Sequence, residues 1–137
     1  SKLFVTDTKA NKVLVFDVMR ASQTAQIPVG KSPHALKLSP DGTRLFVANR
    51  GGSTVSVLDA RSLKILSEIS VGEKPSSMDM TPDGAKLYVT NELSGSISLV
   101  DVPSLMLKEN IPTGIGPKDI VVSSPQREPK IKILSGR

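Results

Sequence analysis

The sequence predicts an all-β fold built from repeated four-stranded sheets, and two patterns carry this prediction. The first is a fixed spacing: Leu-Phe-Val at residues 3–5 returns as Leu-Phe-Val at 45–47 and as Leu-Tyr-Val at 87–89, a period of 42 residues. The second is the alternation of short apolar segments with turn sequences inside each period. Because one inserted residue would exchange the two faces of a strand, the constant spacing indicates that each unit packs on the next with the same geometry.

The repeats run over residues 3–44, 45–86 and 87–128, and residues 129–137 resemble a degenerate strand or a tail. In the middle of the chain we expect strands at 45–49, 55–60, 64–71 and 75–80, which are short, rich in Val, Ile and Leu, and lack helical periodicity. Turns are expected at Ser-Pro-Asp-Gly (39–42) and Thr-Pro-Asp-Gly (81–84). In both sequences Pro presets φ and Gly accepts a positive φ where the chain re-enters a strand.

Several of the expected strands are apolar on both faces, as at residues 13–16 and 45–47, which suits sheets packed between neighbouring sheets. Four antiparallel strands repeated about every 42 residues define the blade of a β-propeller. The chain opens at the second strand of a blade, residues 3–7, and finishes with an innermost strand, residues 117–123. The predicted fold is therefore a partial propeller of about three blades, or half of a closed ring.

Three blades do not close a ring, because propellers have four to eight. Two interpretations stay open. The chain is a piece of a longer propeller, of seven blades for example. Alternatively, two chains form a homodimer that joins head to tail into a six-bladed ring, in which each chain supplies the innermost strand that the other lacks.

Composition excludes several classes of function. The chain has no Cys, which rules out a disulfide scaffold, a thiolate metal site and a Cys nucleophile. Aromatic residues make up 3% and Trp is absent, which argues against a stacking platform for single-stranded nucleic acid. No apolar run approaches the roughly 18 residues of a membrane helix, so we expect no membrane insertion. The net charge of +5 is scattered along the chain and is compatible with an anionic partner.

A family resemblance rests on Tyr-Val-Thr-Asn at residues 88–91, together with the Ser-Pro-Asp-Gly, Leu-Phe-Val-Ala-Asn and Val-x-Val-x-Asp segments of the repeat. Over residues 3 to about 124 the chain resembles the YVTN-type β-propeller repeat proteins. The resemblance implies a periplasmic or cell-surface protein, although the chain shows no signal-peptide pattern. Related propellers are lactonases, amine dehydrogenase heavy chains and haem-binding nitrite reductases. Residues 123–126 read Ser-Ser-Pro-Gln instead of Ser-Pro-Asp-Gly, which puts the last unit in doubt.

No catalytic signature appears in the sequence, and we assign no catalytic residue. The only His is His34, expected at the start of an innermost strand and at the mouth of the central channel. An imidazole there could act as a base or as a metal or haem ligand. Its repeat equivalents are Ser76 and Lys118, however, and one His without Cys supplies too few ligands for zinc. We therefore predict no metal and no cofactor.

Three carboxylates share one repeat position, namely Asp17, Asp59 and Asp101. A ring of carboxylates could bind Ca²⁺ or act as an acid/base pair. Each one, however, comes at the end of a strand and just before a turn, where Asp accepts hydrogen bonds from backbone N–H groups. We interpret these residues as structural turn residues.

The loops at one end of the channel carry positive charge that Glu73 and Glu92 partly offset. The candidate ligand-binding residues of this channel mouth are Lys31, His34, Arg50, Lys74 and Lys118. Converging cations would attract a carboxylate, a phosphate or a nucleic-acid backbone. The sequence favours a non-enzymatic scaffold that presents loops to a protein partner or an anionic ligand. The alternatives are a lactonase-like enzyme, a haem-associated redox propeller and a single-stranded nucleic-acid binder.

Overall fold

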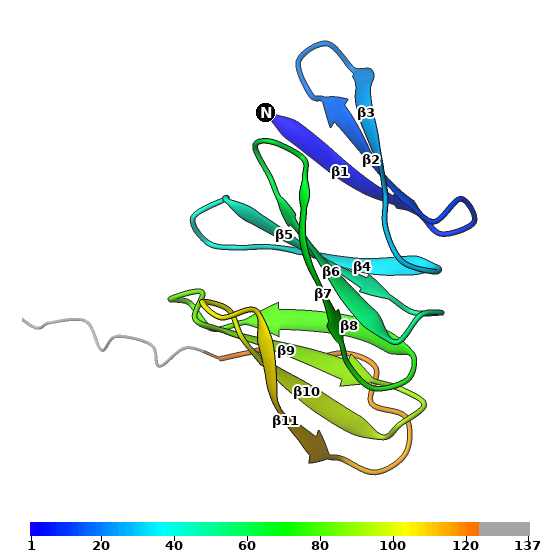
Figure 1. Cartoon of the computed structure of the whole chain (residues 1–137), viewed down its shortest axis with the longest axis vertical. Helices are drawn as coiled ribbons and strands as arrows, with labels where there is room; N and C mark the ends of the chain where they lie inside the picture. The colour runs from blue at the N-terminus through cyan, green and yellow to red at the C-terminus, as the bar shows by residue number, and fades with distance from the viewer. Residues whose placement is uncertain (124–137) are drawn as a thin grey trace, which may run out of the picture.

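The protein folds into three antiparallel sheets that fan out from a common inner edge (Figure 1). The computed structural model describes residues 1–123, and within them every regular element is a β-strand. The all-β prediction is confirmed, and the arrangement is that of a partial β-propeller. The strands are β1 (Lys2–Asp7), β2 (Lys12–Asp17), β3 (Ser22–Pro28), β4 (Pro33–Leu38), β5 (Arg44–Asn49), β6 (Thr54–Asp59), β7 (Ile65–Ser70), β8 (Pro75–Met80), β9 (Lys86–Asn91), β10 (Ser96–Asp101) and β11 (Met106–Pro112).

Each sheet is a meander of consecutive strands. The second blade has the order β4-β5-β6-β7, and the third has the order β8-β9-β10-β11 when followed along the chain. The first sheet, β1-β2-β3, has three strands and begins at the strand equivalent to β5 and β9. The strands expected in the middle of the chain lie within one residue of those observed, because turn chemistry fixes where each one ends.

The Ser-Pro-Asp-Gly turn between β4 and β5 forms as its sequence predicts. Gly42 has φ 73° and donates its N–H to the carbonyl of Ser39 at 2.8 Å. The Asp41 carboxylate accepts from the Ser39 hydroxyl at 2.6 Å and from the Thr43 N–H at 3.0 Å. The Ser39 hydroxyl and then the Thr43 N–H hold the pKa of Asp41 at about 2. A positive φ at Gly42 lets the chain reverse without a Cβ clash.

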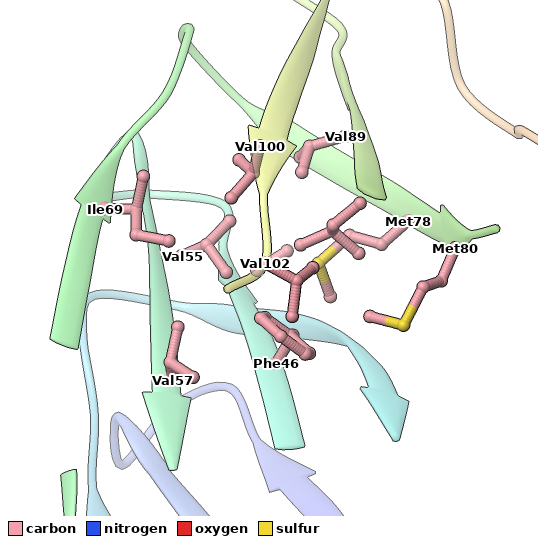
Figure 2. Packing of buried hydrophobic residues seen from close by; sticks show 11 residues of the cluster. Phe46, Val55, Val57, Ile69, Met78, Met80, Val89, Val100 and Val102 are labelled. Carbon is pink, nitrogen blue, oxygen red and sulfur yellow. The ribbon is translucent and has the colours of Figure 1, made fainter. Parts of the chain in front are cut away.

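The core consists of two apolar layers, one between each pair of neighbouring blades. Figure 2 shows the layer between the second and third blades, where side chains of β5 and β6 face side chains of β8, β9 and β10. Phe46, Val55 and Val57 are fully buried there. The other layer joins the first and second blades and includes Val13, Val15, Ile27, Leu45, Val47 and Leu58. Because the middle blade is apolar on both faces, it can pack against both neighbours.

A glycine of each blade linker packs against a buried asparagine of the following blade. A Cβ built on Gly30 would lie 2.4 Å from Nδ2 of Asn49, and one built on Gly72 would lie 2.6 Å from Cγ of Asn91. The Asn91 amide is fully buried and donates to the hydroxyl of Ser98 at 2.8 Å. Only a residue without a side chain fits against each amide, so these glycines set the close approach of neighbouring blades.

Cationic side chains also join the blades. The Lys2 ammonium donates to the Ala60 carbonyl at 2.9 Å, and the Arg44 guanidinium donates to the Val102 carbonyl at 3.0 Å. Lys2 and Arg44 occupy the same position of the 42-residue repeat. The blade interface is therefore repeated in its polar as well as its apolar contacts.

The prediction of an innermost strand at 117–123 is wrong as regards secondary structure, because these residues form no strand. They lie along the third blade instead: the Thr90 hydroxyl donates to the Lys118 carbonyl at 2.8 Å, and the Val122 N–H donates to the Asp79 carboxylate at 2.6 Å. An innermost strand pairs only with the second strand of its own blade, as β4 does with β5. No residue in the described part of the chain offers that pairing to 117–123. The expectations for 129–137, and for most of 123–126, lie outside the described residues.

Within residues 1–123 there is no helix long and apolar enough to cross a membrane.

Candidate functional site

An open hollow of about 550 Å³ lies at the end of the blades where β4 and β8 begin. In Figure 1 these strands begin on the right-hand side. It is formed by loops from all three sheets: the β1–β2, β5–β6 and β9–β10 turns and the β3–β4 and β7–β8 links. Its lining residues are Thr8, Ser32, His34, Arg50, Gly51, Ser53, Glu73, Lys74 and Leu93. Rigid strands on both sides of every loop hold this surface in place.

The five predicted residues of the channel mouth separate into two groups. His34, Arg50 and Lys74 line the hollow together. Lys31 and Lys118 do not line the hollow. Both residues accept hydrogen bonds through their backbone carbonyls: that of Lys31 accepts from the Gly51 N–H at 3.0 Å, and that of Lys118 accepts from the Thr90 hydroxyl.

Glu92 organises the charges beside the hollow. Its carboxylate accepts from the Ser76 hydroxyl at 2.8 Å and from the Arg50 guanidinium at 3.2 Å, and it lies 3.4 Å from the Lys74 ammonium. The Ser76 hydroxyl and then Arg50 and Lys74 hold the pKa of Glu92 at about 2, so this carboxylate stays ionised at neutral pH. Glu92 therefore holds both cations close to one another and neutralises part of their charge.

Repetition explains how these residues meet. Thr8, Arg50 and Glu92 occupy one position of the 42-residue repeat, so they lie on adjacent blades at the same end of the channel. Thr8 donates its hydroxyl to the carbonyl of Pro33 at 2.8 Å, which joins the first sheet to the start of β4. Sequence reasoning missed Thr8 as a lining residue, although its repeat register with Arg50 could have indicated it.

The backbone at the base of the hollow is left-handed at one repeated position. Ser32 has φ 53° and Lys74 has φ 58°, and the equivalent residue of the next unit is Gly116 with φ 71°. A left-handed conformation costs roughly 1–2 kcal/mol at a non-glycine residue, so the surrounding blade packing must hold Lys74 in it. In the sequence, the glycine at position 116 could have indicated that Ser32 and Lys74, its repeat equivalents, have a positive φ. The blade packing thus fixes the backbone conformation of Lys74 beside the hollow.

The predicted turn carboxylates lie at the opposite end of the blades from the hollow, and each bonds to its own turn. Asp17 accepts from the Arg20 N–H at 2.9 Å, and Asp59 accepts from the Ser62 N–H at 2.8 Å. Asp101 accepts from the hydroxyl of Ser104 at 2.6 Å. The Ser62 N–H is the main cause that lowers the pKa of Asp59. Residues 1–123 contain no cluster of three or more His, Asp or Glu side chains that could hold a metal ion.

The innermost strands carry one further ion pair. Lys37 of β4 lies 2.9 Å from the Asp79 carboxylate of β8, and the same carboxylate accepts from the Val122 N–H. The Val122 N–H and then Lys37 hold the pKa of Asp79 at about 2. This carboxylate links three successive repeats along the inner edge of the blades.

The fold and the inner-edge loops define an arc of a β-propeller. The chain belongs to the family of seven-bladed β-propeller lactonases, because the family model described as "Lactonase, 7-bladed beta-propeller" matches residues 1–116. No curated protein matches the chain.

Solved structures support the same fold. The chain is similar to the hydrazine synthase of Kuenenia stuttgartiensis, with a TM-score of 0.82 and 28% identity over 87% of this chain and 35% of that one. It is similar to the dihydro-heme d1 dehydrogenase NirN, with a TM-score of 0.74 and 28% identity over 84% of this chain and 26% of that one. The WD40 repeats of RRP9 share the fold alone, with a TM-score of 0.74 and 17% identity over 82% and 35% of the two chains. The chain thus spans between about a quarter and about a third of the length of these chains.

Proposed function

We propose that the chain is part of a non-enzymatic β-propeller binding module whose channel-mouth hollow takes a small anionic ligand or the acidic side chain of a protein partner. The observation that carries the proposal is the pair of cations, Arg50 and Lys74, held by one carboxylate, Glu92, at the edge of a hollow built from three blades. Binding to groups that are already fixed costs little ordering entropy.

The charge balance sets the class of ligand. The lining includes the cations Arg50 and Lys74 together with His34 and Glu73, and Glu92 forms an ion pair with each of the two cations. Because the two carboxylates offset the two cations, these groups give no net positive charge to attract a polyanion, and a small anion would bind through direct contacts with Arg50 and Lys74. Leu93 is 70% exposed and offers an apolar wall, so a carboxylate with a short hydrocarbon part fits the surface chemistry.

The test is calorimetric titration with succinate and with inorganic phosphate at low salt. Saturable binding that weakens at least tenfold in Arg50→Gln and in Lys74→Gln supports the proposal. Arg61→Gln is the matched control, because Arg61 lies on the turn capped by Asp59 at the far end of the blades. Absence of saturable binding, or an equal loss in the Arg61→Gln variant, would contradict it.

The second candidate is a lactonase-like enzyme, which the family match favours. His34 and Glu73 line one hollow with Arg50, so a base and a cation that could stabilise an oxyanion share the site. Acid release from a simple δ-lactone, followed at constant pH, separates the candidates. Hydrolysis that disappears in His34→Gln supports the enzyme and removes the non-enzymatic proposal.

Visible haem absorbance of the purified protein would instead support a haem-associated propeller like the NirN relative.

We also propose a periplasmic or cell-surface location and a place among the YVTN-type repeat proteins, on the resemblance of residues 3 to about 124. Fractionation of cells that express the gene, with detection of the protein by antibody, tests this location. Recovery in the cytoplasmic fraction alone would contradict it.

A further inference from the structure

Among the described residues that line the hollow, only His34 is of a type whose charge changes near neutral pH. The charged or titratable residues of the lining are His34, Arg50, Glu73 and Lys74. An imidazole gains a proton between about pH 8 and about pH 5, a range in which arginine, lysine and glutamate side chains ordinarily keep their charge. Glu92 also stays ionised there, because the Ser76 hydroxyl and then the Arg50 guanidinium hold its pKa at about 2. The charge of this surface near neutral pH is therefore set by one side chain.

The repeat places His34 beside Arg50. These two residues occupy the positions in the second blade that Ser76 and Glu92 occupy in the third, 42 residues further along. In the third blade the two side chains touch, because the Ser76 hydroxyl donates to the Glu92 carboxylate at 2.8 Å. In both blades the preceding proline pairs with the asparagine before Arg50 or Glu92, so the backbone register is the same. The imidazole therefore lies next to the guanidinium that the proposed anion would contact.

The charged groups around His34 leave its ring unpaired within residues 1–123, where no ion pair involves it. Its strand, β4, packs against β1, β5 and β8. Besides Glu92, the charged residues of these elements and their loops at this end of the blades are Asp7, Lys9, Lys31, Arg50, Glu73 and Lys74. Asp7 accepts from the Ala10 N–H at 3.1 Å and, like Lys9 and Lys31, does not line the hollow. A proton on His34 would therefore add a charge that no ion pair already neutralises.

We propose that protonation of His34 regulates the hollow, so that small anions bind more tightly as the pH falls from about 8 to about 5.5. This inference rests on the anion site proposed above. While His34 is neutral, Arg50 and Lys74 are balanced by Glu73 and Glu92, and its protonation leaves these groups with one net positive charge. A unit charge about 4 Å from an anion in water strengthens binding roughly fivefold. Since coupling is reciprocal, a bound anion must favour the protonated imidazole by the same factor.

The first experiment follows the imidazole itself by proton NMR, where its ring C–H signals are unique because the chain has one His. The midpoint of their pH titration is measured in sodium sulfate and in sodium chloride of the same ionic strength, since sulfate stays fully ionised over this range. A fivefold coupling corresponds to a midpoint that is higher by about 0.7 pH unit in sulfate. In Arg50→Gln the two midpoints should coincide. Equal midpoints in the parent protein overturn the proposal.

The second experiment measures sulfate binding by calorimetry at about pH 5.5 and at about pH 8, where the affinity should be roughly fivefold higher at the lower pH. This ratio should fall to about one in His34→Gln, whose fold should be retained because His34 is exposed. Glu73→Gln is the matched control, since it removes another titratable side chain from the same lining and should keep the ratio.

The outcomes separate this inference from the proposed function. Saturable binding that requires Arg50 but has the same affinity at both pH values, or a ratio that persists in His34→Gln, overturns regulation by His34 and leaves the anion site standing. Absence of saturable binding of both sulfate and succinate at either pH removes the site and its regulation together.

Discussion

Gly72→Ala should destabilise the protein, although a similar change at an unconstrained glycine would stabilise it. The new Cβ would lie 2.6 Å from Cγ, 2.7 Å from Cβ and 2.7 Å from Nδ2 of Asn91. These contacts are shorter than any that real Cβ atoms make. The Asn91 side chain cannot move away freely, because it is fully buried and donates to the hydroxyls of Ser96 and Ser98.

The magnitude follows from two costs. Overpacking of a filled site costs roughly 1–3 kcal/mol. Displacement of the amide also weakens two hydrogen bonds worth roughly 1 kcal/mol each. We expect a total loss of about 2–4 kcal/mol in the free energy of unfolding. Gly72 has no positive φ, and a Gly→Ala change at such a position would otherwise stabilise by about 0.4–1 kcal/mol. The clash therefore predicts a lower free energy of unfolding for Gly72→Ala, whereas the entropy effect alone predicts a higher one.

Urea unfolding followed by circular dichroism measures this difference. With a slope of about 1–3 kcal/mol per molar urea, the midpoint should fall by about 1 M or more. Gly42→Ala is the control. Gly42 has φ 73°, and nothing lies within 4 Å of a Cβ built on it, so this variant should lose only the backbone cost of about 1 kcal/mol. Asn91→Ser should lose less stability in the Gly72→Ala background than alone. A Gly72→Ala midpoint at or above that of the parent protein would refute the contact.

Three further predictions concern stability. Asp79 has a folded-state pKa of about 2, below its ordinary 3.8, so its contribution is complete above about pH 4 and is lost as the pH falls through about 2. The urea midpoint should drop over that interval, and less so in Asp79→Asn; equal drops would count against the ion pair. Arg44→Met should cost about 1 kcal/mol, because the bond to the carbonyl of the next blade is lost while the aliphatic stem remains, and an unchanged thermal midpoint would contradict this. Ala21→Gly should stabilise by up to about 1 kcal/mol in chemical denaturation, because Ala21 has φ 49°, and a lower midpoint would show that no strain is released.

The fold was predictable because its signal repeats. A period of 42 residues sets strand positions three times over, and the turn at residues 39–42 marks where one strand ends and the next begins. The segment 117–123 shows the limit of this reasoning. Its sequence matches an innermost strand, but a strand also requires a partner, and the described residues provide none.

The candidate site was predictable in part. Position along the repeat placed His34, Arg50 and Lys74 at one end of the channel, where the hollow lies. The same reasoning could not exclude Lys31, because the direction of a side chain depends on the conformation of its loop. It identified Glu92 as an opposing charge, but the contact of this carboxylate with both Arg50 and Lys74 depends on three-dimensional packing.

The fold depends most on the contact of successive blades through their apolar faces. Nuclear Overhauser contacts of the Phe46 ring test it directly. Phe46 is fully buried in the layer between the second and third blades, beside Val57 of its own blade and Val102 of the next (Figure 2). We expect strong contacts from the ring to methyl groups of the third blade. Contacts confined to methyl groups of its own sheet would contradict the stacking of the blades.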